Sequence, residues 1–130
     1  MSCPYRRDAP SGVWAREEYE KLPRYDAPTI EQPTGVFICH QYDHQSVGSR
    51  VCAGWAGCHD GDELLALRIA VLEEQMSPEQ AQAIRDYSSP VALFGSGSEA
   101  AEHGLAELDR PGSRAVEAID KITRVRGDLR

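Results

Sequence analysis

The chain has 130 residues, of which 41% are hydrophobic and 27% are charged, and its formal net charge is −7 at pH 7. This length suits one globular domain over residues 1–130 with a modest core, and it leaves no room for a separate catalytic domain. Residues 60–110 carry eleven acidic and three basic side chains. Such a surface repels phosphate and argues against nucleic-acid binding.

The sequence contains neither an apolar export signal nor an apolar run of about 18 residues, the length that spans a membrane. We therefore expect a cytoplasmic protein without a membrane span. Because thiols stay reduced in the cytoplasm, the four cysteines are expected to bind a metal rather than to form two disulfides. Disulfide pairing remains an alternative only if the chain is exported by a non-standard route.

The first 35 residues are expected to be irregular around one short helix. Residues 1–13 are rich in turn formers, and residues 14–22 can form a helix that ends before Pro23. Three prolines within residues 23–35 prevent a regular element there. This stretch is therefore predicted to be an ordered loop or an extended arm.

A β-hairpin is predicted next. Residues 36–39 are the first predicted strand, because the three residues before Cys39 are β-branched or aromatic. Residues 41–49 form a polar, hairpin-like loop. Residues 50–53 are the predicted partner strand. This pairing would bring Cys39 and Cys52 close together, as two ligands of one metal ion require.

The pattern becomes helical after residue 60. Residues 64–72 are apolar apart from Arg68, which predicts a helix that is buried on most sides. Ser77 and Gln80 have the spacing of a capping box, with proline at the first helical position, and open a helix that reaches about residue 87.

Two further helices are predicted in the last third of the chain. Residues 91–94 are a short apolar run, strand or extended, and Ser96 with Glu99 then forms a second capping box that opens a helix to about residue 108. Ser113 is expected to cap a last helix with three apolar residues on one face, Val116, Ile119 and Ile122. The predicted fold class is therefore α+β, with a small metal-binding β-hairpin or loop element in residues 1–60 and three to four helices in residues 61–130.

Cysteine and histidine gather in residues 36–60, which hold three of the four cysteines and three of the four histidines. Thiolate and imidazole are the ligands that zinc prefers, and structural zinc sites take four of them. The predicted metal ligands are Cys3, Cys39, Cys52 and Cys58, with His40 or His59 as substitutes. Neighbouring residues rarely bind the same ion. One member of the pair Cys39–His40 and one of the pair Cys58–His59 is therefore expected to be free of metal.

Several alternatives stay open. The chain has no Cys-x₂-Cys pair, so the cysteines can also be small buried hydrophobes. Four thiolates suit an iron–sulfur cluster as well as zinc. Gly54 and Gly57 either let backbone N–H groups approach a metal-bound sulfur or only turn the chain.

Enzyme motifs are largely missing. The sequence has no phosphate-binding glycine loop, no G-x-S-x-G and no H-E-x-x-H, and we assign no catalytic or cofactor-binding residue. A zinc hydrolase would keep one open coordination position and use Asp43, His44 or Asp60 as its base. His103 is expected on the surface of its helix.

Four short motifs resemble those of a small cysteine-containing family of unknown function, found mainly in actinobacteria and their phages. They are Cys3-Pro4-Tyr5-Arg6, Gly12-Val13-Trp14, Phe37-Ile38-Cys39-His40 and Cys52-Ala53-Gly54-Trp55. The resemblance implies metal binding and brings no activity. Many members carry a further cysteine three positions before the first motif, which a chain that starts at Met1 lacks. Cys58 or His40 is therefore expected to supply the fourth ligand, or the site is three-coordinate and open.

These observations predict a cytoplasmic, acidic, zinc-stabilised protein that acts by binding another protein. The expected contact surface is the acidic stretch 60–110 together with Tyr19, Tyr25 or Tyr42. An iron–sulfur redox or sensor protein and a zinc-dependent hydrolase are the alternatives.

Overall fold

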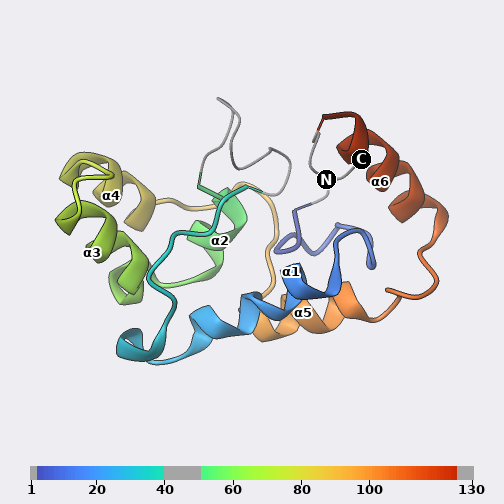
Figure 1. Cartoon of the computed structure of the whole chain (residues 1–130), viewed down its shortest axis with the longest axis horizontal. Coiled ribbons are helices and arrows are strands. Elements are labelled where there is room, and N and C mark those ends of the chain that lie inside the picture. Colours follow the sequence, from blue (N-terminus) through green and yellow to red (C-terminus); the bar gives the residue numbers. More distant parts are fainter. Residues whose placement is uncertain (1–2, 40–50, 126–130) are drawn as a thin grey trace.

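The computed structural model describes residues 3–39 and 51–125, and this part of the chain is helical (Figure 1). Its α-helices are α1 (Arg16–Glu20), α2 (Ala53–Cys58), α3 (Leu65–Leu72), α4 (Pro78–Arg85), α5 (Gly97–Leu105) and α6 (Ser113–Val125). Three short 3₁₀ helices accompany them, η1 (Leu22–Asp26), η2 (Thr29–Glu31) and η3 (Gly61–Glu63). None of the described helices has the length and hydropathy needed to cross a membrane.

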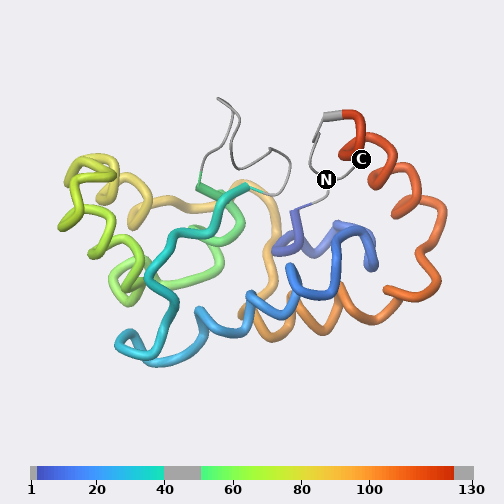
Figure 2. The backbone as a smooth tube through the Cα atoms, in the orientation of Figure 1, coloured from blue at the N-terminus to red at the C-terminus, as the bar shows by residue number. Residues whose placement is uncertain are grey.

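The backbone trace places α2 near the middle of the molecule (Figure 2). The α3–α4 pair lies at one end and α6 at the other, while α5 runs along one edge beside α1 and η1 (Figure 1). The predicted α+β class is wrong, because residues 3–39 and 51–125 contain no strand, sheet or hairpin. Only two isolated antiparallel bridges occur there, between Ile38 and Val51 and between Arg6 and Leu93.

Helix starts explain why the bridges do not grow into strands. The Cys52 N–H donates to the Phe37 carbonyl at 2.7 Å, but Cys52 is also the N-cap of α2. Likewise, the Phe94 N–H donates to the Tyr5 carbonyl at 2.9 Å, and the N-cap of α5, Ser96, follows two residues later. β-branched and aromatic residues favour strands only weakly, and here the helix that follows each run limits the pairing to one bridge.

The core is built around aromatic side chains. Trp55 and Tyr5 are fully buried, and Tyr25 makes edge-to-face contacts with Trp55 and Phe37 at ring-centroid distances of 5.4 and 6.0 Å. Tyr19 and Tyr25 are 2% and 7% exposed, so the prediction that they form a contact surface is wrong. Tyr42 lies outside the described residues.

Glycines allow α5 to pack closely on the first part of the chain. A Cβ on Gly97 would collide with the Leu22 carbonyl, and one on Gly104 would collide with the Tyr19 ring. The Tyr19 hydroxyl accepts hydrogen bonds from the N–H groups of Val13 and Trp14 at 3.0 and 3.1 Å. These contacts fix η1 and the turn before α1 against α5.

The capping box at Ser77 and Gln80 is confirmed, because the two side chains cap each other's backbone N–H groups at 2.9 and 3.1 Å. At α5 only half of the predicted box forms. Ser96 caps the Glu99 N–H, whereas the Glu99 carboxylate accepts from the N–H of Gly95 instead of that of Ser96. The helix ends at Leu105, earlier than predicted.

The last helix also differs from the prediction. Ser113 is the first residue of α6 rather than its cap. Ala115 and Ile122 are buried, Ile119 is half-buried, and Val116 is 49% exposed. Residues 115, 119 and 122 have the i, i+4, i+7 spacing of one helix face, so the buried face begins one residue earlier than expected.

Candidate metal centre

Two of the four predicted metal ligands meet in the structure. The sulfur atoms of Cys3 and Cys52 lie 3.7 Å apart. A disulfide would hold them at about 2.05 Å. Two thiolates bound at about 2.3 Å to one tetrahedral zinc ion lie about 3.8 Å apart. The observed separation therefore suits two ligands of one ion, and without an ion it suits a thiol–thiolate hydrogen bond.

Three segments far apart in the sequence position this pair. Cys3 lies in a tight turn whose carbonyl accepts from the Arg6 N–H at 3.0 Å, with Pro4 buried inside the turn. Cys52 precedes α2 and is tied to Phe37 through its backbone. The pair therefore links the N-terminal turn, the segment before residue 40 and the start of α2.

Backbone N–H groups point at both sulfurs. Those of Tyr5 and Gly54 hydrogen-bond to the Cys3 sulfur, and that of Trp55 hydrogen-bonds to the Cys52 sulfur. A Cβ on Gly54 would lie 2.5 Å from the Cys3 sulfur, so only glycine allows this approach. Such N–H···S bonds stabilise thiolates and are a usual second layer around metal-bound cysteine.

Gly57 has a different role. A Cβ on this residue would meet the side chains of Leu93 and Tyr87 at 2.8 and 3.3 Å, and no sulfur is among its nearest neighbours. Only one of these two glycines therefore lets the backbone approach a sulfur. That residue is Gly54, whereas Gly57 makes room for apolar side chains.

The two thiols differ in how readily each loses its proton. The hydrogen bond from Cys52 and the backbone N–H groups lower the pKa of Cys3 from 9.0 to about 7, against the opposing effect of burial. The same hydrogen bond, together with burial, raises the pKa of Cys52 well above its usual value. Since the thiolate is the form that binds metals and reacts, Cys3 is the readier ligand of the two.

The other predicted ligands are placed less closely. Cys39 is half-buried and near enough to Cys52 to contribute to the raised pKa of that thiol. Cys58 lies at the far end of α2, six residues and about 9 Å along the helix from Cys52. Within residues 3–39 and 51–125, no three His, Cys, Asp or Glu side chains are arranged as a metal site. His40, His44 and Asp43 lie outside the described residues.

His59 belongs to a separate polar cluster. Its side chain is only 8% exposed, with Nδ1 3.7 Å from Asp26 Oδ1 and Nε2 3.5 Å from the Tyr5 hydroxyl. Burial lowers the pKa of His59, despite the opposing effect of Asp26, so the imidazole is neutral at pH 7. Asp26, which sequence reasoning missed, accepts from the N–H groups of Gly97 and Ser98, both at 2.8 Å. No local pattern predicts that contact, because it joins residues 71 and 72 positions apart.

A model of a family of unknown function, DUF6283, matches residues 1–126. The chain belongs to this family. No curated protein and no solved structure matches it. The family resemblance read from the sequence is therefore confirmed as membership of a family of unknown function, which assigns no activity to the cysteines.

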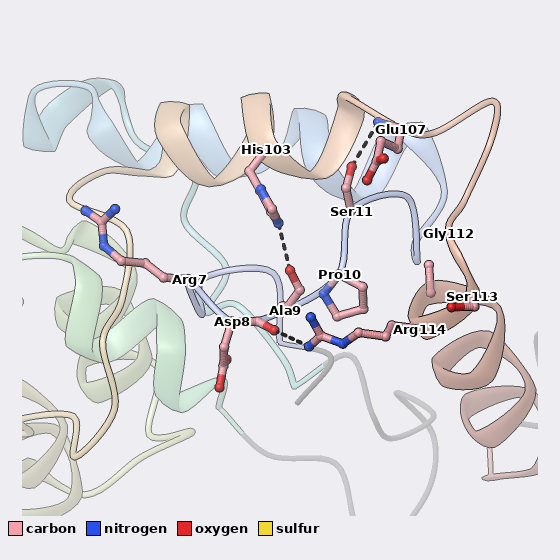
Figure 3. Close-up of a pocket in the computed structure, with 11 residues that line it drawn as sticks. Arg7, Asp8, Ala9, Pro10, Ser11, His103, Glu107, Gly112, Ser113 and Arg114 are labelled. Carbon is pink, nitrogen blue, oxygen red and sulfur yellow. Dashed lines mark hydrogen bonds between the residues drawn. The ribbon is translucent and has the colours of Figure 1, made fainter.

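A cavity of this DUF6283 member, about 350 Å³ in volume, lies between residues 7–11, α5 and α6 (Figure 3). Its polar groups bind one another. His103 Nε2 is 2.7 Å from the Ala9 carbonyl, and Arg114 donates to the Asp8 carbonyl at 2.8 Å. Ser11 Oγ accepts from the Glu107 N–H at 2.9 Å. These contacts join the turn to both helices, and His103 is a half-buried member of them rather than the surface residue expected.

Proposed function

We propose that Cys3 and Cys52 are two ligands of a zinc ion and that this cytoplasmic protein is a small metal-stabilised module that binds another protein. The observation that carries the metal site is the 3.7 Å separation of the two sulfurs. It is supported by three backbone N–H groups directed at them. When bound, zinc would neutralise the thiolates and cross-link the N-terminal turn to α2.

The remaining ligands are proposed from the sequence. Cys39 is the third ligand, since it lies near Cys52 and the Ile38–Val51 bridge holds its segment against the start of α2. The fourth is His40, the residue after Cys39, or Cys58 or His59 at the opposite end of α2. Single substitutions of these three residues decide between them.

Burial favours a structural role for the metal over a hydrolytic one. Cys52 is 2% exposed and belongs to the aromatic core. A hydrolytic zinc keeps a coordination position open to water and substrate, whereas structural sites are closed. A closed thiolate site contributes free energy of folding, so the function we infer lies on the surface that the metal helps to hold in shape.

Elemental analysis and an absorbance spectrum on protein purified without air test the metal site. One zinc per chain and no colour are the expected result. Iron with acid-labile sulfide and visible absorbance would replace zinc by an iron–sulfur cluster. The absence of both metals, with four free thiols, would overturn the site and leave Cys3 and Cys52 as core residues.

A further inference from the structure

The Cys3–Cys52 pair has the geometry of a reversible oxidation site as well as that of a metal site. We propose that a hydroperoxide oxidises these two cysteines to a disulfide and that this reaction releases the zinc ion. The inference rests on the proposed zinc site and adds its regulation, whereas the pairing of the two sulfurs does not depend on a metal. Disulfides that form in a reducing cytoplasm are usually transient and serve catalysis or redox sensing.

The two sulfurs are close enough to bond after a small movement. They lie 3.7 Å apart, and a disulfide needs about 2.05 Å, so the sulfurs must approach by about 1.7 Å. In the described part of the chain, no other two cysteine sulfurs are hydrogen-bonded to each other. The fold therefore selects this pair over the other combinations of the four cysteines.

Burial gives the two cysteines different roles. Cys3 is half-buried and can meet a small oxidant, whereas Cys52 is 2% exposed. Backbone N–H groups of Tyr5 and Gly54 point at the Cys3 sulfur and stabilise negative charge there. Cys3 is therefore the sulfur that attacks the peroxide, and Cys52 is the sulfur that resolves the product.

The backbone of Cys52 is the fixed side of the pair. Its N–H donates to the Phe37 carbonyl at 2.7 Å, and its carbonyl accepts from the Ala56 N–H at 3.1 Å. Cys3 belongs to a turn at the start of the chain, which the Arg6 N–H closes with one hydrogen bond to the Cys3 carbonyl at 3.0 Å. The approach of the two sulfurs is thus a movement of Cys3 toward Cys52.

The reaction balances with a hydroperoxide as the only oxidant. The Cys3 thiolate attacks one peroxide oxygen, the O–O bond breaks, and the other oxygen takes up a proton and leaves as an alcohol, or as water from hydrogen peroxide. Cys3 is then a sulfenic acid. The Cys52 sulfur attacks the Cys3 sulfur, the S–S bond forms as the S–O bond breaks, and hydroxide takes up a proton and leaves as water. Two electrons have passed from the two sulfurs to the peroxide.

Oxidation changes which segments of the chain are joined. Zinc bound by Cys3, Cys39 and Cys52 would tie three segments together, whereas a disulfide joins two of them. Because the thiolate is the form that binds metals, the disulfide offers no ligand to zinc. The Cys39 segment then keeps the isolated Ile38–Val51 bridge without a metal bond beside it, so a partner that contacts this segment would sense the oxidant.

The test uses the full chain purified without air, with its zinc content measured, and hydrogen peroxide as the probe. A zinc-sensitive dye follows metal release, and mass spectrometry of digests maps the disulfide. Trypsin places Cys3, Cys39 and Cys52 in different peptides, and chymotrypsin cuts after Trp55 and separates Cys52 from Cys58. The expected result is one Cys3–Cys52 disulfide and one released zinc ion per chain, both reversed by dithiothreitol when zinc is present.

The same reaction in concentrated urea shows whether the fold selects the pair. The entropy of loop closure favours cysteines that are near in sequence. An unfolded chain should therefore join Cys52 to Cys58 or Cys39 in preference to Cys3, which lies 49 residues away. Native conditions should reverse that order. Equal yields of the Cys3–Cys52 disulfide in urea and in buffer would contradict selection by the fold.

Two glycines of α2 give a matched pair of variants. Gly54→Ala would place a Cβ 2.5 Å from the Cys3 sulfur, which has to move away, and should slow disulfide formation about tenfold or more. Gly57→Ala, whose Cβ meets Leu93 instead, should change the rate by less than about twofold. Circular dichroism establishes that each variant is folded before the rates are compared. Equal rates in the two folded variants would contradict the positioning of Cys3 against Cys52.

The remaining outcomes separate this inference from the metal site. A disulfide through Cys39 or Cys58, or oxidation to sulfinic acid without a disulfide, would overturn the oxidation site, and a Cys3–Cys52 disulfide without loss of zinc would overturn the release. A chain purified without zinc that still forms the Cys3–Cys52 disulfide would contradict the metal site alone. A zinc-loaded chain that keeps its metal and its thiols under peroxide would contradict the oxidation alone.

Discussion

The two ends of α2 carry the same kinds of residue in opposite settings. At its start, Cys52 lies beside Cys3, and backbone N–H groups point at both sulfurs. At its end, Cys58 lies near carboxylates, and burial, Asp26 and Glu99 raise the pKa of its thiol to about 12. Free N–H groups at a helix start stabilise a thiolate, while burial beside carboxylates keeps a thiol protonated. The groups around each thiol, and not its residue type, therefore separate Cys3, whose pKa is lowered to about 7, from Cys58, whose pKa is raised to about 12.

The largest expected effect comes from removing a sulfur at the start of α2. Cys52→Ser should lose bound zinc and cooperative unfolding at 25 °C, since structural zinc contributes about 10 kcal/mol or more to folding in small domains. Cys58→Ser is the matched variant at the other end, and it should keep both properties where His40 or His59 is the fourth ligand. Elemental analysis and thermal melting followed by circular dichroism measure the two properties. Equal zinc loss in both variants would mean that Cys58 is the fourth ligand and that one ion joins the two ends.

A smaller effect is expected from the two glycines of α2. Alanine at either position gains helix propensity, about 1 kcal/mol in each case. Gly54→Ala would place its Cβ 2.5 Å from the Cys3 sulfur and 2.8 Å from Tyr5 Cβ, atoms of a fixed turn. Gly57→Ala would place it 2.8 Å from the end of the Leu93 side chain, which can move. Chemical denaturation should show Gly54→Ala less stable by about 2 kcal/mol and Gly57→Ala nearly unchanged, and the reverse order would contradict the close approach at Cys3.

The smallest expected effect is on the pH dependence of the metal-free protein. With a pKa lowered from 9.0 to about 7, Cys3 contributes stability that is present above pH 9 and is lost as the pH falls through 7. With a pKa raised to about 12, Cys58 contributes stability below pH 9 that is lost as the pH rises toward 12. Alkylation rates of each cysteine, measured by mass spectrometry against pH, should show these separate midpoints. A single titration midpoint for Cys3 and Cys58 would mean that the thiol pKa values do not differ between the two ends of α2.

Local patterns were the predictable part of this fold. The capping box of Ser77 and Gln80 formed as expected because all its atoms lie within one turn of chain. The hairpin at residues 36–53 did not form in the described residues, because the same residue that would pair, Cys52, begins a helix. Strand preference and helix capping competed at one position, and the sequence pattern alone does not rank them.

The candidate site was predictable in residue type but not in pairing. Sequence spacing suggested Cys39 as the neighbour of Cys52, whereas the sulfur 3.7 Å from that of Cys52 belongs to Cys3, 49 residues away. The approach depends on a turn fixed by Pro4 and on the open space over Gly54. Asp26 meets Gly97 and Ser98 for a similar reason, through the docking of η1 against α5. Contacts of this range follow from tertiary packing, which no short window of sequence contains.

The contacts of residues 3–12 have a consequence for folding during synthesis. These residues bind partners along nearly the whole chain, at Cys52, Ala92, Gly104 and Arg114. A ribosome releases them first, yet their last partner emerges only after more than a hundred further residues. Non-local contacts of this kind slow folding, because chain entropy is lost before they form. The N-terminal residues therefore complete their contacts only when Arg114 of α6 has been made, and until Cys52 and Gly54 emerge the Cys3 thiol is open to solvent, metal donors and oxidants.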